Sequence, residues 1–369
     1  MVAGRILVTG AGGPGAVNLS RSLLAMTPQP WILAVDASPH YVLLALGHER
    51  AVVPRASDCE AYLAEINRLV AAHHIDFVMP NNSLEIAVLS AHRSRLDAPI
   101  FLPAPPVLET ANSKWASYER WSRSEVPVPE TALISSPDDV HAAFQAMQPD
   151  AETPVWVRGA GIPGKGIGVA SLPCRTVDQA VQWISYWNGW GGMIASAFLP
   201  GRNLTWMGLF DEGQLITSQS RERLAYVIPH VSPSGITGAP AISKTIHDHE
   251  VNRIGEAAVL TLDSTYTGVG FVDMKGDVEG RPRVTELNAG RFGTTHFFYT
   301  AAGANFPGLM LQVAAGHLPD VPKYDILPAG LVWIRTLDAG PVLTTTDAIS
   351  QGTLPSLTSG QQWPTVPQR

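Results

Sequence analysis

The sequence predicts a protein of mixed class: an α/β domain with a Rossmann-like parallel sheet, followed by an α+β part. Three observations support this prediction. Short apolar runs alternate with segments of helical spacing over residues 1–105. A proline-rich stretch at residues 103–106 indicates a domain boundary. From Met193 onward, the pattern is mainly that of β-strands.

The first domain begins as a series of strands and helices. We predict strands at residues 5–9, 31–35 and 76–80, and helices at 17–24 and 59–73. The strands are nearly continuous apolar runs. Such runs indicate a parallel sheet that is covered on both faces.

The remaining elements follow from the same patterns. We predict helices at residues 114–121, 177–187, 249–262 and 305–315, and strands at 154–158 and 167–173. Residues 126–129 read as an extended segment because they contain two prolines. The tail after about residue 354 is rich in Ser, Thr, Gln and Pro, so we expect it to be poorly ordered.

The composition is that of a globular chain with a large core. Of its 369 residues, 45% are hydrophobic and 15% are charged, which argues against disorder. The net charge is -7 and there is no long basic run, so nucleic acid is not an expected partner. Cys59 and Cys174 are too few for a disulfide framework and fit no zinc-binding spacing.

The sequence also bears on location and assembly. Residues 1–8 read as a strand and lack the basic and then apolar layout of a signal peptide. No uninterrupted apolar run reaches the ~18 residues that span a membrane. We therefore expect a cytoplasmic protein with no membrane partner, and a homodimer as the default assembly of a soluble enzyme.

A glycine-rich turn at residues 10–15 follows the first strand and opens the first helix. It matches the dinucleotide-binding fingerprint, and Asp36 lies at about the spacing that binds a ribose hydroxyl. The same turn also occurs where a strand packs tightly onto a helix, or where another anion binds at the helix N-terminus. An NAD-dependent enzyme is therefore one of three interpretations of this turn.

A second glycine-rich segment spans residues 159–166. It nearly satisfies the P-loop pattern, but Gly166 stands where Ser or Thr would bind Mg²⁺, and a strand follows instead of a helix. A hairpin flap fits better. Its backbone N–H groups could close over phosphates, with Arg158 and Lys165 supplying positive charge. The alternative is a mobile surface hairpin without a ligand.

An acidic hairpin spans residues 270–291. If its turn is centred near Gly280, Asp273 and Glu286 lie opposite each other. Glu286 and Asn288 are two residues apart and share one face of their strand. These oxygen ligands, with the cationic Arg291 just beyond, suit Mg²⁺ that holds a nucleotide phosphate. The alternative is a polar hairpin with a solvated charged face.

Together these parts resemble the ATP-grasp superfamily over roughly residues 1–320, and most closely its carboxylate–amine ligase and carbamoyl-phosphate-synthase-like branches. The two lobes of such proteins hold ATP between them. The resemblance implies a Rossmann-like domain at 1–105, a small lobe with the flap at 106–190, a large lobe with the Mg–ATP site at 191–320, and a partly disordered C-terminal extension at 321–369.

The resemblance also implies residue roles. Lys114, at the start of the first lobe, and Arg158, at the end of the strand before the flap, match basic residues that contact ATP and support catalysis. Backbone groups of the flap and its lysine would cover the phosphates. The residues concerned are Gly161, Gly164, Lys165 and Gly166.

The acidic hairpin matches the metal site of the family. Asp273, Glu286 and Asn288 correspond to the ligands of Mg²⁺, and Arg291 corresponds to an arginine that stabilises the transferring phosphoryl group. Arg291 comes three residues after Asn288, where the common spacing in the family is two. This shift leaves the role of Arg291 open.

The segment between the lobes, residues 195–203, departs from the family. It lacks the usual glutamate near the adenine amine. Asn203 stands where an acid would bind the ribose, and its amide can still hydrogen-bond a hydroxyl. Backbone groups around Phe198 and Leu199 could hold the adenine. Selectivity for the nucleotide is therefore less defined than the phosphate chemistry.

Five residues are candidates for contact with the acceptor substrate. Arg221 and Arg223 share one face of a predicted strand, and two guanidinium groups suit a carboxylate or phosphate. Each candidate also has a structural alternative, such as an exposed ion-pair strand for the arginines or a structural hydrogen bond for the histidine. The other candidates are Gly238, His296 and Glu85.

The function predicted from these features is that of an ATP-dependent, Mg²⁺-requiring ligase. It would activate a carboxylate as an acyl phosphate and join it to an amine, releasing ADP and phosphate. One alternative is phosphorylation of carbamate or bicarbonate, which would use the same ATP residues. The others are an NAD(P)-dependent oxidoreductase and a nucleotide-binding protein without catalysis.

Overall fold

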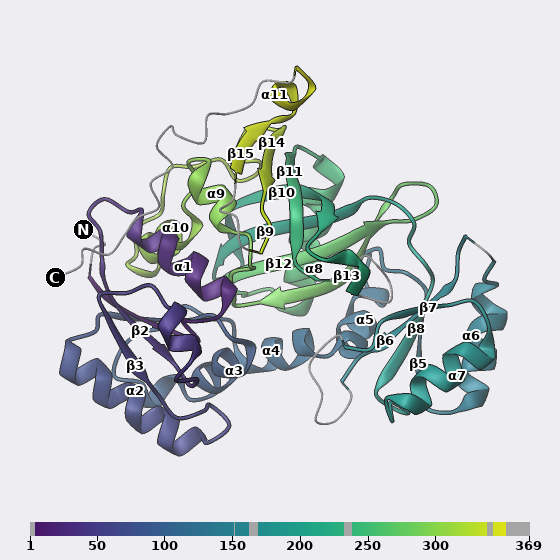
Figure 1. Ribbon diagram of the computed structural model, residues 1–369, viewed down its shortest axis with the longest axis horizontal. Helices are drawn as coiled ribbons and strands as arrows, with labels where there is room; N and C mark the ends of the chain where they lie inside the picture. The colour runs from purple at the N-terminus through teal and green to yellow at the C-terminus, as the bar shows by residue number, and fades with distance from the viewer. Residues whose placement is uncertain (1–3, 151, 162–168, 232–237, 338–341, 352–369) are drawn as a thin grey trace.

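The fold is known from a computed structural model that describes residues 4–150, 152–161, 169–231, 238–337 and 342–351. In this part of the chain the strands form three sheets (Figure 1). An N-terminal sheet and a small sheet lie at the two ends of the lower half of the view, and a large sheet lies above and between them. No described helix is long and apolar enough to cross a membrane.

The N-terminal sheet is parallel, as predicted, with the strand order β3-β2-β1-β4. Strand β3 and the short 3-10 helix η1 were not predicted, because three of the four residues of β3 are exposed and it lacks the apolar run of its neighbours. The elements are β1 (Arg5–Thr9), α1 (Pro14–Leu24), β2 (Trp31–Asp36), η1 (Tyr41–Leu44), β3 (Glu49–Val52), α2 (Cys59–His73), β4 (Phe77–Pro80) and α3 (Ser83–Ala91).

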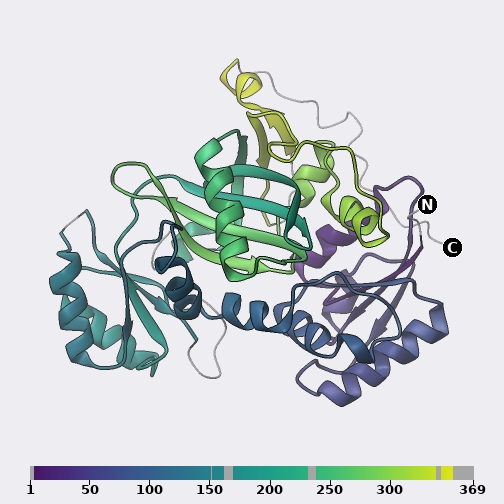
Figure 2. The ribbon, with the colours of Figure 1, turned by 180° about the vertical axis from the view of Figure 1, so that it is seen from behind.

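Two helices connect the N-terminal sheet to the small sheet. Helix α4 (Pro105–Asn112) begins within the predicted boundary, and α5 (Lys114–Ser122) follows it directly. The Ser113 side chain caps α5 by accepting a hydrogen bond of 3.2 Å from the Ala116 N–H. This cap fixes Lys114 as the first residue of α5. Seen from behind, α4 and α5 lie beneath the large sheet, between the N-terminal sheet and the small sheet (Figure 2).

The small sheet is antiparallel, with the order β5-β8-β6-β7. Helices α6 and α7 pack on it around a core that includes Phe144, Val157 and Ile184. The predicted strand at 167–173 begins later, as β7, and residues 162–168 lie outside the described part. The elements are β5 (Thr131–Ile134), α6 (Pro137–Met147), β6 (Val155–Gly159), β7 (Leu172–Cys174), α7 (Val177–Tyr186) and β8 (Met193–Ser196).

The large sheet has the order β13-β12-β9-β10-β11-β14-β15 and is antiparallel throughout. Its elements are β9 (Asn203–Asp211), β10 (Gln214–Tyr226), β11 (Pro240–Ile246), α8 (His249–Leu262), β12 (Gly268–Gly276), β13 (Pro282–Ala289), α9 (Phe297–Ala301), α10 (Phe306–Ala314), β14 (Leu331–Ile334) and β15 (Val342–Thr345). A 3-10 helix, η3 (Pro229–Val231), and a short helix, α11 (Thr346–Ser350), complete this region.

Both faces of the large sheet are buried, and neighbouring residues of β12 serve different cores. Val272 packs with α8 and α5 on one face. Phe271 packs on the other face in a core shared with α1, α9 and α10. Asp273 and Lys275 follow Phe271 on that second face because side chains alternate along a strand. The same alternation that builds the cores therefore turns these two charged residues toward the site described next. The tail after residue 354 lies outside the described residues.

Candidate functional site

The acidic hairpin has the predicted register. Asp273 of β12 pairs directly with Glu286 of β13, and the turn between the strands contains Gly280 with a φ of 81°. Thr205 on the adjacent strand donates a hydrogen bond of 2.9 Å to Asp273, and Arg223 lies 3.2 Å from the same carboxylate oxygen. Asp273 is thus held in place from two neighbouring strands of the sheet.

Glu286 lies at the centre of a second set of contacts. It forms an ion pair with Lys114, whose side chain is only 5% exposed. Asn288 donates a hydrogen bond of 3.2 Å to the other carboxylate oxygen. Burial by itself would raise the pKa of Glu286, but the charges of Lys114 and Arg158 outweigh burial and lower that pKa. Glu286 is therefore an ionised carboxylate at neutral pH.

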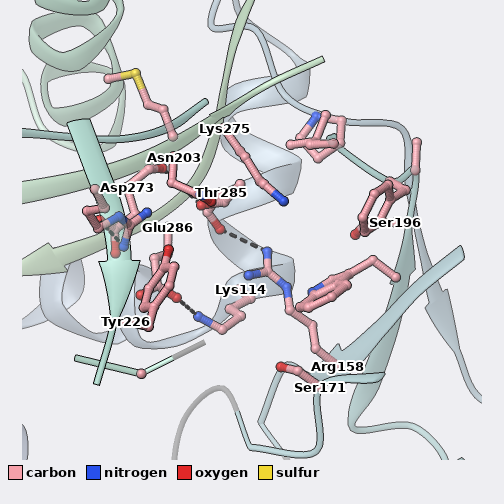
Figure 3. A pocket seen from close by; sticks show the side chains of 18 residues that line it. Lys114, Arg158, Ser171, Ser196, Asn203, Tyr226, Asp273, Lys275, Thr285 and Glu286 are labelled. Atoms are coloured by element: carbon pink, nitrogen blue, oxygen red, sulfur yellow. Dashed lines mark hydrogen bonds and ion pairs between the residues drawn. The ribbon is translucent and has the colours of Figure 1, made fainter. Parts of the chain in front are cut away.

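Arg158 connects the small sheet to the acidic hairpin. It extends from β6 and donates a hydrogen bond of 2.9 Å to the backbone carbonyl of Thr285 (Figure 3). Its Nε atom is buried and has no hydrogen-bond partner among the described residues. Lys114 and Arg158 thus reach the Glu286 region from different elements, and both keep N–H groups that a ligand could use.

A cavity of about 270 Å³ lies among these residues. Phe198, Leu199 and Asn203 line it as well, together with Trp156 and Gly238. Cationic side chains outnumber carboxylates on its wall, an arrangement that suits a polyanion such as a nucleoside triphosphate. The charged residues lining it are Lys114, Arg158, Arg223, Lys275, Asp273 and Glu286.

A second cavity, of about 770 Å³, lies between the N-terminal sheet and the large sheet. Lys114 and Glu286 line both cavities, so the ion pair stands at their junction. Arg291 and Asn288 line only the larger one, and the Arg291 guanidinium donates a hydrogen bond to the Asn288 side-chain oxygen. The glycine-rich turn forms another part of the wall, through Gly10, Gly13 and Gly15.

Asn81 positions the segment that carries Arg291. Its side chain accepts a hydrogen bond of 2.7 Å from the Phe292 N–H and donates one of 3.1 Å to the Phe292 carbonyl. These paired bonds join the end of β4 to a segment 211 residues later in the sequence. The sequence indicates only that Asn81 ends a parallel strand, where ligands commonly bind. Its contact with Phe292 depends on how the domains pack.

The geometry of the first glycine-rich turn does not favour a dinucleotide. The Asp36 carboxylate accepts hydrogen bonds of 2.9 Å from the Gly12 N–H and 2.8 Å from the Ser38 N–H, so it stabilises the turn itself. A β carbon added to Gly12 would lie 2.0 Å from the backbone oxygen of Tyr41. Helix η1 therefore packs directly on the turn, and its glycine serves this close contact.

The candidates for acceptor binding separate into two groups. Arg223 and Gly238 line the smaller cavity. Arg221, His296 and Glu85 line neither of the two cavities described above. Arg221 is buried, contacts Thr295 through a hydrogen bond, and stacks 5.8 Å from the centre of the Tyr299 ring.

His296 and Glu85 have structural contacts instead of cavity positions. The His296 ring hydrogen-bonds the Gly293 carbonyl at 2.8 Å, and burial lowers the pKa of His296 to about 4, so the ring is neutral. Glu85 accepts a hydrogen bond of 2.8 Å from Thr9, and burial raises the pKa of Glu85 to about 7. Both residues are buried, so the prediction that they contact the acceptor is not supported by the two cavities. Their burial depends on tertiary packing that local sequence patterns do not reveal.

The glycine flap is described only in part. Gly161 is exposed, and apart from its chain neighbours no atom of the described residues lies within 4 Å of where its β carbon would be. Gly164, Lys165 and Gly166 lie outside the described residues. Lys275 was missed at the sequence level, although its spacing of two residues from Asp273 places it on the same face of β12. Trp156 and Tyr226 also line the smaller cavity and were not predicted.

Comparison with known proteins supports a relationship to ligases. No family model matches the chain. The chain is 24% identical over 233 residues to phosphoribosylamine–glycine ligase from Salmonella typhimurium, an alignment that covers 59% of this chain and 53% of that enzyme. The chain thus spans about half the length of the curated relatives it matches.

Solved structures show the fold. The biotin carboxylase domain of 2-oxoglutarate carboxylase from Hydrogenobacter thermophilus, solved as a dimer with MgADP, ADP and bicarbonate, aligns with a TM-score of 0.66 and 14% identity, covering 90% of this chain and 74% of that one. L-amino acid ligase from Bacillus licheniformis aligns with a TM-score of 0.63 and 15% identity, covering 90% and 78%.

The fold is that of the ATP-grasp proteins, the class that the sequence motifs predict. Within that class, the chain is similar to the carboxylate–amine ligases and to the bicarbonate-using carboxylases.

Proposed function

We propose that the protein is an ATP-dependent, Mg²⁺-requiring ligase that joins a carboxylate to an amine and releases ADP and phosphate. The observation that carries this proposal is the ion pair of Lys114 and Glu286 at the junction of two cavities. One cavity has the excess positive charge that a triphosphate needs, and the other is large enough for a small-molecule acceptor. The residues at the junction are placed to act on the group transferred between them.

In this proposal the small and large sheets are the two lobes that hold ATP. The lobes would span residues 106–190 and 191–320, after a Rossmann-like domain at 1–105 and before an extension at 321–369. Lys114 and Arg158 would contact the phosphates, and Phe198, Leu199 and Asn203 would surround the base and ribose. Flap residues 159–166 would cover the phosphates and exclude water, which otherwise hydrolyses an acyl phosphate.

The donor set fits magnesium bound together with a nucleotide. Among the described residues there is no group of three or more His, Cys, Asp or Glu side chains that could hold a metal ion by itself. Mg²⁺ usually takes one or two carboxylates and completes its shell with phosphate oxygens and water. Asp273, Glu286 and the Asn288 amide oxygen match that pattern. When bound, the ion would neutralise negative charge on the phosphate group.

For this reaction the protein mainly has to position the reactants and neutralise negative charge. Transfer of the γ-phosphoryl group to the acceptor carboxylate breaks the bond to ADP and forms an acyl phosphate. An amine then attacks the carbonyl carbon and expels phosphate, leaving an amide and a proton. Arg291, which lines the acceptor cavity, would stabilise charge on the transferring group, an effect worth about 10³–10⁵ in rate for arginines in that role.

Phosphorylation of bicarbonate or carbamate is a second candidate. It is supported by the structural similarity to a biotin carboxylase domain that binds bicarbonate. The nucleotide residues would be the same, and only the acceptor would differ. That domain is also solved as a dimer, which supports a homodimer here.

A phosphate-release assay tests the proposal. The protein would be incubated with Mg–ATP and a panel of amino acids, small acids and bicarbonate. We expect release above background only with particular acceptors, and product analysis then separates amide formation from bicarbonate activation. Thermal-shift measurements provide the control, because Mg–ATP should stabilise the protein whereas NAD and NADP should not. Stabilisation by NAD alone would contradict the proposal.

A further inference from the structure

Lys275 is a cation in the smaller cavity that forms no ion pair with a carboxylate of the described residues. It lies two residues after Asp273 on β12, and it lines the cavity with Phe198 of the segment that joins the two sheets. Its amino group is 5.0 Å from the centre of the Phe198 ring. Across the described residues, no carboxylate lies within ion-pair distance of it. Burial and the nearby Arg223 lower the pKa of Lys275 to about 8.

The register of the sheet places Lys275 away from the metal end of the cavity. Phe271 pairs with Asn288, Asp273 with Glu286, and Lys275 with Arg283. Asn288, Glu286 and Lys275 therefore follow one another in a single direction along these two paired strands, with Lys275 at the end opposite Asn288. Residues two apart on a strand are separated by about 7 Å. A nucleotide whose phosphates lie at Glu286 would bring its ribose and base toward Lys275.

The other residues at this end suit a nucleobase. Trp156 and Phe198 have ring centres 6.2 Å apart, and Leu199 and Asn203 complete this part of the wall. Residues 195–203 contain no carboxylate that could accept a hydrogen bond from the adenine amine. The two carboxylates of the cavity, Asp273 and Glu286, are already paired with Arg223 and Lys114. Near Phe198, the amine of Lys275 is a charged group that no described carboxylate pairs with, so it is available to the base.

The two purines differ in what they offer to such an amine. Both present the N7 acceptor, but adenine has a donor amine at position 6, whereas guanine has the acceptor O6. A lysine can donate to N7 and O6 of guanine together, and to N7 alone in adenine. A carboxylate in its place would favour adenine instead.

We propose that Lys275 determines base selectivity by donating hydrogen bonds to N7 of a purine and to O6 of guanine, so that the site binds guanine nucleotides at least as tightly as adenine nucleotides. This inference rests on the proposed function, because it assumes that the smaller cavity holds a nucleotide. It adds guanine nucleotides to the cofactors that the site can take, and it assigns selectivity to one residue.

Calorimetric titration with Mg²⁺ and non-hydrolysable analogues of ATP, GTP and 7-deaza-GTP tests the inference in the wild type, K275M and K275R. In the wild type we expect the GTP analogue to bind no more weakly than the ATP analogue. The 7-deaza-GTP analogue should bind about 10-fold more weakly than the GTP analogue. K275M should lose about 10-fold or more in affinity for the GTP analogue, lose less for ATP, and no longer distinguish 7-deaza-GTP. K275R should retain most of the wild-type preference.

Lys323 provides a matched control, because it lies outside both cavities and pairs with Glu256 at 2.8 Å. K323M should bind all three analogues as the wild type does. If K275M lost the same affinity for all three analogues, Lys275 would contact the phosphates, and the inference would be overturned. A wild-type preference for the ATP analogue that K275M leaves unchanged would also overturn it. These outcomes leave the proposed function intact. Failure of the wild type to bind any analogue would overturn both.

Discussion

Lys114 and Glu286 form an ion pair although they lie 172 positions apart in the sequence. Lys114 is the first residue of α5, and Glu286 is on β13. Each residue lines both cavities, so the pair connects the region suited to a triphosphate with the region suited to an acceptor.

Replacing Glu286 by Gln should abolish turnover while leaving the fold intact. The amide keeps the shape of the side chain but removes the charge that would bind Mg²⁺ and that now balances Lys114. We expect acceptor-dependent ADP formation to fall by about 100-fold or more, given that even outer partners of metal ligands are worth about 10–100-fold. E279Q is the control, because Glu279 lies in the turn of the same hairpin and contacts Arg281 instead of the cavity. Unchanged turnover in E286Q would exclude the metal role.

Replacing Arg158 by Met should weaken nucleotide binding. Its buried guanidinium has an unpartnered N–H and lies on the cavity wall, where a phosphate could accept the bond. A hydrogen bond to a charged group is worth about 1.5–3 kcal/mol, so the Kd for a Mg–ATP analogue should rise by roughly 10- to 100-fold. The exposed Arg175 serves as a comparison, since R175M removes the same charge from a residue that does not line the cavity. Equal affinities of R158M and wild type would argue against a phosphate contact.

Asn81 should act on turnover more than on nucleotide affinity. N81A removes both hydrogen bonds to Phe292 and would release the segment that carries Arg291. We expect kcat to fall by about 10- to 100-fold, as small displacements of catalytic groups commonly cause. The KM for the nucleotide should change little, because Asn81 lines only the larger cavity.

Asn67 offers a control with the same chemistry. Its side chain donates to the Arg95 carbonyl at 2.7 Å and accepts from the Asp97 N–H at 3.1 Å, away from both cavities. N67A should therefore retain wild-type kcat even if it loses some stability. A matching loss of kcat in both variants would indicate a general effect on folding.

Glu85 should make stability depend on pH. Its pKa is raised to about 7 in the folded protein, mainly by burial, with Asp36 adding to the effect. Between its unfolded pKa of about 4.3 and pH 7, the unfolded chain loses the proton first, so stability falls as pH rises. E85Q removes this loss and should raise the free energy of unfolding by up to about 3 kcal/mol at pH 8, and by almost nothing at pH 4.

Denaturant unfolding at the two pH values measures this difference. E109Q is a suitable control, because Glu109 is exposed on α4 and should give the wild-type result at both values. If the difference in free energy of unfolding between E85Q and the wild type were the same at pH 4 and pH 8, the ionisation of Glu85 would not limit stability.

Local patterns were sufficient to predict some elements closely. Helices α2 and α8 have the predicted bounds, and each begins after an aspartate, Asp58 or Asp248, whose side chain caps it. The pairing of Asp273 with Glu286 was also predictable, because a short turn fixes the register of a hairpin. These features depend on residues that are close together in the sequence.

The features that were missed depend on distant residues. Strand β3 has little apolar character, and it is defined by pairing with β2 instead. The burial of Arg221 and His296 depends on how α9 and the large sheet pack together. Likewise, the partner of Asn81 lies just after β13 of the large sheet, and no spacing within the first 105 residues indicates it.

We propose that one site between the small and large sheets holds both Mg²⁺ and a nucleoside triphosphate. A crystal structure with Mg²⁺ and a non-hydrolysable ATP analogue would reveal whether it does. We expect a metal ion about 2.1 Å from carboxylate oxygens of Asp273 and Glu286, with Lys114 and Arg158 contacting the phosphates. A triphosphate bound elsewhere, with both carboxylates still paired only with Arg223 and Lys114, would rule out this site.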